Sequence, residues 1–172
     1  DFNNLDESQP NLGLSPWTLK SGYYTSWDPS QWLVGTGTNF VCDGTSLQAM
    51  DAPSIATLLL ISPKLYIPAD RYAKISFYML RSGINPKDLE GFKVYVNDVG
   101  DIYSYDSNGE VVVDGDVAST LVEPILHATR YVDGLLYEQM YQVEVNIPAE
   151  YSGKEFYVIF EAIQEYSSDN YI

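Results

Sequence analysis

The chain has 172 residues, of which 45% are apolar and 19% are charged, and its 24 Asp and Glu against 9 Lys and Arg give a formal charge of −15. This composition supports one folded domain with its own core and excludes a largely disordered chain. The charge excludes most nucleic-acid-binding surfaces, which need clustered Lys and Arg, and it disfavours binding to an anionic membrane. Every apolar run is far shorter than the roughly 20 residues that cross a bilayer, so we expect no transmembrane segment.

Short stretches of alternating apolar and polar residues recur along the chain and predict antiparallel strands. In chain order we expect strands at residues 17–20, 31–34, 46–50, 57–61, 71–80, 92–97, 141–147 and 156–163. Pro63 and Pro68 bracket a short edge piece, because proline lacks the N–H that a ladder needs. The last stretch is apolar on both faces, with Glu161 as the exception, and this pattern predicts a central strand.

The region between residues 97 and 141 is less regular. Asn108-Gly109 separates residues 102–105 from residues 111–113 and is a signal for a two-residue hairpin. Residues 117–131 fit either a short helix or another irregular strand. No internal repeat and no Gly/Ser-rich linker occurs, so we expect a single domain over residues 1–172. Many short strands without alternating helices favour an all-β jelly-roll β-sandwich, with a closed barrel as the alternative.

The sequence offers few parts for catalysis. Cys42 is the only cysteine, which excludes a disulfide framework and a zinc site with several thiolates. His127, the only histidine, has apolar neighbours and fits a structural role better than that of a general base. Glu161 and Glu165 are the acids that stand out, but a sheet-face position explains them more simply than a glycosidase pair. We therefore predict no catalytic residues and no enzyme.

Two features point to binding. Tyr23, Tyr24 and Trp27 lie close together in the sequence, and flat aromatic rings stack on sugars, so we predict them as ligand-binding residues, although packing in the core would also explain them. Acids also recur at intervals within glycine-containing loops, where oxygen ligands suit calcium but solvated loops would look the same. These acids are Asp98, Asp101, Asp106, Asp114 and Asp116.

The order of segments along nearly the whole chain resembles the cleaved-adhesin or choice-of-anchor J domains, which are related to MAM-type jelly rolls. The most specific pieces are residues 61–65 (ISPKL) and residues 151–154 (YSGK) followed by an alternating strand. The other matching segments are residues 2–3, 16–18, 42–49, 59–68, 75–78, 92–96, 143–160 and 168–172.

This resemblance implies a jelly-roll domain outside the cell or on the surface of a Bacteroidetes-type bacterium, in some cases carried by a lipoprotein or a larger adhesin. Such domains are binding modules for glycans or host proteins, and several are associated with calcium. The positions that match the family's cation site are Asn3 and Asp43. The stretch around residues 100–137 is longer than in typical members, which indicates an insertion with its own surface.

Three functional hypotheses follow. The first is an adhesin-like binding module whose glycan or protein ligand meets loops and exposed tyrosines. The second is a structural or accessory domain without a ligand, which positions another part of a larger surface protein. The third is a hydrolase, which requires two carboxylates that face each other within roughly 5 to 10 Å.

Overall fold

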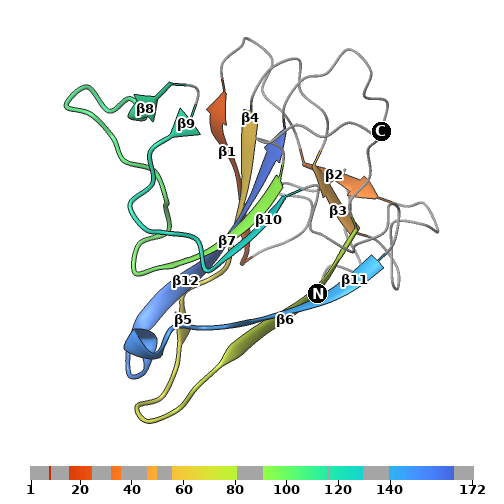
Figure 1. Ribbon diagram of the computed structural model, residues 1–172, viewed down its shortest axis with the longest axis vertical. Coiled ribbons are helices and arrows are strands. Elements are labelled where there is room, and N and C mark those ends of the chain that lie inside the picture. The colour runs from red at the N-terminus through yellow and green to blue at the C-terminus, as the bar shows by residue number, and fades with distance from the viewer. Residues whose placement is uncertain are drawn as a thin grey trace.

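The computed structural model describes residue 8 and residues 16–24, 32–35, 46–49, 56–80, 91–115, 117–129 and 140–164. The short 3-10 helix η3 (Ala149–Tyr151) precedes the last strand. The described strands, shown in Figure 1, are β1 (Thr18–Tyr24), β2 (Trp32–Gly35), β3 (Ser46–Ala49), β4 (Ala56–Ile61), β5 (Leu65–Tyr66), β6 (Lys74–Leu80), β7 (Gly91–Asn97), β8 (Val113–Asp114), β9 (Val117–Ala118), β10 (Leu126–Thr129), β11 (Met140–Asn146) and β12 (Glu155–Gln164). The prediction of an all-β protein is confirmed.

The main sheet has the strand order β1-β4-β12-β7-β10, and β5 pairs with the beginning of β12. All of its pairs are antiparallel. Strand β12 lies between β4 and β7, so the central position predicted from its two-sided apolar pattern is confirmed. Among the described strands the sheet is open, with β1 and β10 at its edges, which differs from the closed-barrel alternative.

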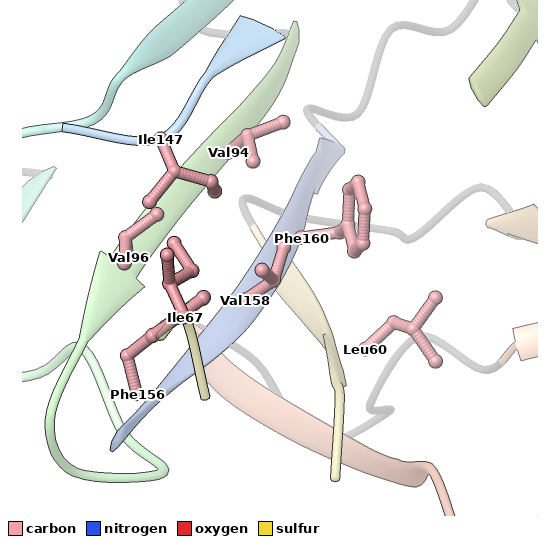
Figure 2. Packing of buried hydrophobic residues seen from close by; sticks show 8 residues of the cluster. All are labelled: Leu60, Ile67, Val94, Val96, Ile147, Phe156, Val158 and Phe160. Atoms are coloured by element: carbon pink, nitrogen blue, oxygen red, sulfur yellow. The ribbon is translucent and has the colours of Figure 1, made fainter. Parts of the chain in front are cut away.

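One side of the main sheet is covered by the antiparallel pair β6–β11, which crosses the lower part of Figure 1 as a curved ribbon. Side chains of β4, β7 and β12 that point to this side form a buried cluster, shown in Figure 2. Ala73, Ile75 and Phe77 of the ribbon pack against that cluster. We call this the ribbon side of the sheet.

The opposite side, which we call the outer side, is covered by residues 98–115 and 117–123, the outer segment. Ile102 and Tyr103 of this segment are buried together with Leu59, Tyr95 and Ile159 of the sheet. Each of the three central strands therefore has an apolar residue on both sides. This two-sided cover explains why residues 156–163 are apolar at almost every position.

The turn at Asn108-Gly109 differs from the predicted two-residue hairpin. The N–H of Asp106 donates to the carbonyl of Glu110 at 2.8 Å, so three residues lie within the loop. Gly109 has a φ of +82°. Asn108 has a negative φ, since Asp70 is the one described residue other than glycine with a positive φ. A two-residue type I′ turn needs positive φ at both central residues, whereas a three-residue loop needs a left-handed residue only at its last position. Residues 117–118 and 126–129 form strands and not a helix.

Candidate functional site

The outward side of the β6–β11 ribbon carries exposed tyrosine and polar side chains. Strand residues alternate between faces, so Ala73, Ile75 and Phe77 turn inward while their neighbours turn to solvent. The alternation continues past the start of β6 to Tyr72, because the N–H of Ile147 still donates to the carbonyl of Ala73 at 3.0 Å. We call this surface the ribbon face; its residues are Tyr72, Lys74, Ser76, Tyr78, Gln142, Glu144 and Asn146.

Cross-strand pairing fixes the polar side chains of the ribbon face. Tyr78 lies opposite Gln142, and Ser76 lies opposite Glu144. Gln142 Nε2 donates to Ser76 Oγ at 3.3 Å. Lys74 Nζ donates to Glu144 Oε1 at 2.7 Å across the diagonal of the pair. These contacts hold an amide, a hydroxyl and an ion pair side by side on the ribbon face.

The two tyrosines of the ribbon face are open to solvent. Tyr72 is 84% exposed and Tyr78 is 58% exposed. Tyr78 lies six positions after Tyr72 in extended chain, which corresponds to about 20 Å. The polar side chains of the ribbon face therefore lie between two aromatic rings that present most of their surface to solvent.

A buried carboxylate occupies the outer side of the main sheet. Glu161 of β12 is only 3% exposed. The hydroxyl of Tyr95 donates to its Oε2 at 2.8 Å, and the hydroxyl of Tyr103 donates to its Oε1 at 2.9 Å. Tyr103 also shares a hydrogen bond with Thr57. Because Tyr95 belongs to β7 and Tyr103 to the outer segment, this carboxylate ties the outer segment to the sheet.

Two basic residues lie in one row with Glu161 on the β7 side of the sheet. Lys93 of β7 lies directly opposite Glu161, with Nζ 4.0 Å from Oε2, and His127 of β10 lies opposite Lys93. Burial raises the pKa of the Tyr95 hydroxyl, and the Glu161 carboxylate raises it further, so this hydroxyl stays protonated and keeps donating. Burial lowers the pKa of His127, Lys93 lowers it further, and Glu161 partly offsets both. Both oxygens of Glu161 already accept hydrogen bonds, an arrangement that suits a structural role.

A second ionic contact lies at the base of the outer segment. Lys20 Nζ donates to Asp101 Oδ2 at 2.7 Å, and the hydroxyl of Tyr105 donates to the same oxygen at 2.9 Å. Asp101 Oδ1 accepts from the backbone N–H groups of Ile102 and Tyr103. Burial raises the pKa of Asp101, but the hydrogen bonds from Lys20, Tyr103 and Tyr105 outweigh burial, so the pKa lies below its ordinary value of 3.8.

Asp101→Asn is expected to flatten the acid limb of the stability curve. A carboxyl whose pKa is lower in the folded state binds fewer protons there than in the unfolded chain, so its stabilisation is present above pH 3.8 and is lost as the pH falls through the folded value. Urea unfolding between pH 6 and pH 2 measures this loss. Asp114→Asn is the control, since no described donor contacts that side chain. An unchanged acid limb in Asp101→Asn would contradict the assignment.

The predicted site residues fall mostly outside the described part of the chain. Trp27 and the predicted calcium ligands Asn3 and Asp43 lie there, as do Cys42 and Glu165. The calcium site and its ligands therefore stay a prediction. Among the described residues, no group of three or more His, Cys, Asp or Glu side chains is arranged to hold a metal ion.

Tyr23 and Tyr24 lie in β1, beyond a register shift that begins at Ser21. The structure describes their backbone alone, so their role in binding stays a prediction. The ribbon face was missed as a site. The sequence did contain a signal for it. In the alternating pattern of residues 72–78, one face carries two polar residues with a tyrosine at each end.

No family model, curated protein or solved structure matches this chain. The described residues include no helix that is both long enough and apolar enough to span a membrane. The feature of this chain that bears most directly on function is the ribbon face.

Proposed function

We propose that this chain is a binding module that acts outside the cell or on its surface, where it contacts a glycan or protein ligand and catalyses no reaction. The observation that carries the proposal is the exposure of Tyr72 and Tyr78 on one face, beside the fixed polar side chains of that face. Tyrosine is among the residues that contribute most at binding surfaces, because a rigid ring supplies contact area at a small entropic cost.

The resemblance of the segment order to cleaved-adhesin domains supports the same function and a location outside the cell or on its surface. The geometry of Glu161 favours binding over hydrolysis, since each of its oxygens accepts from a tyrosine hydroxyl and the nearest described charged partner is Lys93. A general acid or nucleophile needs an oxygen free to meet a substrate. Glu161 instead contributes to the stability of the fold.

Tyr78→Ala is expected to weaken ligand binding about tenfold or more, which is the effect of losing a central aromatic contact. The purified wild-type chain is screened on a glycan array and on a panel of immobilised extracellular proteins, and the affinity of each variant is then measured for the strongest ligand. Tyr66→Ala is the matched control, because Tyr66 is 59% exposed but lies on β5, which pairs with β12 and is not part of the ribbon.

Equal affinity of Tyr78→Ala and Tyr66→Ala would remove the ribbon face from the binding site. No ligand on either screen would favour the alternative of a structural or accessory domain without a ligand. Thermal unfolding of both variants verifies that they are folded, since exposed substitutions of this kind change stability by only about 0.5 kcal/mol.

A further inference from the structure

The ribbon face is electrically neutral in a strongly acidic chain. Its two charged side chains, Lys74 and Glu144, form an ion pair with Nζ and Oε1 2.7 Å apart, and the remaining side chains carry no charge. The chain as a whole has a formal charge of −15. Charge complementarity therefore points to an uncharged ligand on the ribbon face. A cationic ligand would be attracted more strongly to the acidic parts of the surface, and an anionic ligand would be repelled by the net negative charge of the chain.

The hydrogen-bonding groups of this face match hydroxyl groups. A side-chain amide offers donors and acceptors together, and a serine hydroxyl does the same, so Gln142, Asn146 and Ser76 present both kinds of group. Sugar hydroxyls also donate and accept at once. A protein partner would be expected to meet apolar anchors at the centre of its interface, whereas the described side chains between Tyr72 and Tyr78 on the ribbon face are all polar.

The tyrosine rings complete the match. The ring of Tyr78 lies in the same cross-strand pair as Gln142, so a sugar stacked on the ring comes within reach of the amide. The apolar face of a pyranose ring packs on an aromatic ring while its equatorial hydroxyls point sideways to polar neighbours. Tyr72, just before β6, offers a second ring about 20 Å away along the extended chain, which suits a chain of sugars better than a single one.

We propose that the ribbon face binds an uncharged oligosaccharide, which lies along β6 and β11 with one sugar stacked on Tyr78 and another on Tyr72. This inference rests on the proposed binding function and names its ligand class. The amides and the Ser76 hydroxyl orient the sugars, and the Lys74–Glu144 pair lies beneath the middle of the ligand.

The test uses the whole chain and an array of neutral oligosaccharides, including glucans, mannans and xylans, beside sialylated and sulfated glycans and immobilised proteins. We expect binding to a neutral oligosaccharide, with an affinity that changes less than twofold between 50 mM and 500 mM NaCl, since no ionic contact is screened. The affinity of Tyr78→Ala for this oligosaccharide is expected to be lower by tenfold or more. The affinity of Tyr78→Phe is expected to be lower by less than threefold, because the phenyl ring still stacks on the sugar. Tyr66→Ala is expected to bind as the wild type does.

The outcomes separate this inference from the proposed function. Binding that is confined to charged glycans or proteins, yet lost in Tyr78→Ala, overturns the neutral ligand and keeps the binding function. Binding to a neutral oligosaccharide that is equal in Tyr78→Ala and the wild type overturns the location. Failure to bind any glycan or protein overturns both. Gln142→Leu adds a second variant, for which we expect at least a threefold loss from the missing amide.

Discussion

Phe160→Ala is expected to lower the free energy of unfolding by about 4 kcal/mol, within the range measured for buried phenylalanines replaced by alanine. Phe160 is buried on the ribbon side of β12, and its ring centroid lies 5.3 Å from that of Phe77 on the ribbon and 5.7 Å from that of Phe92 on β7. A third ring, that of Trp17, lies 6.3 Å away. One substitution thus removes apolar area and three ring contacts, and leaves a cavity between the sheet and the ribbon.

Chemical denaturation followed by tryptophan fluorescence measures this loss. Phe160→Leu is the matched control, since it keeps most of the apolar volume and loses the ring contacts; we expect it to cost less than half as much. A loss below about 1 kcal/mol for Phe160→Ala would show that the ribbon does not depend on this cluster for its place on the sheet. Phe77 is the ribbon residue whose ring contacts that of Phe160, so Phe77→Ala is also expected to lower the free energy of unfolding.

Glu161→Ala is expected to lower the free energy of unfolding by about 3 kcal/mol, although it removes a buried charge. Without the carboxylate, the hydroxyls of Tyr95 and Tyr103 lose the acceptor that each now has at 2.8 and 2.9 Å, and Lys93 loses its opposite charge. The buried hydroxyl of Tyr95 then loses its acceptor, and the hydroxyl of Tyr103 keeps only its contact with Thr57, and these losses account for most of the effect. The same denaturation experiment measures it.

Two companion variants show whether the hydrogen bonds cause the effect. Glu161→Gln keeps a carbonyl acceptor and is expected to lose less than Glu161→Ala. In a chain that already carries Tyr95→Phe and Tyr103→Phe, Glu161→Ala is expected to lower the free energy of unfolding much less, because neither ring has a hydroxyl that needs an acceptor. Equal costs in the two backgrounds would contradict the role assigned to the tyrosines.

The sheet itself was predictable because alternation is a local property of the chain. The eight predicted strands are found within a few residues of their expected bounds, and the apolar pattern of residues 156–163 places β12 at the centre. The one polar residue in that stretch, Glu161, could be seen in the sequence but not explained. Its acceptor role depends on hydroxyls 66 and 58 positions away, and pairing across such separations leaves no local signature.

The candidate site was harder to predict for a different reason. Clustering in the sequence drew attention to Tyr23, Tyr24 and Trp27, whereas Tyr72 and Tyr78 come together with Gln142 only through the pairing of β6 with β11. Alternation showed which residues of β6 share a face but did not show that β11 lies beside it. The turn at residues 106–110 was predicted in the right place, and its length depends on hydrogen bonds of the Asp106 side chain with the N–H groups of Asn108 and Glu110.

The central place of β12 has a consequence for how the chain is made. Of the described strands it is the last to be synthesised, yet β4 and β7, its two neighbours, pair with each other only through it. Until residues 155–164 emerge, the nascent chain holds two half-sheets, each with an unsatisfied inner edge that can pair with other chains. When β12 is made, it pairs with β4 and β7, which are far from it in the sequence, and pairing over such separations is slow. The yield of folded domain should therefore depend on a holdase that shields those two edges during synthesis.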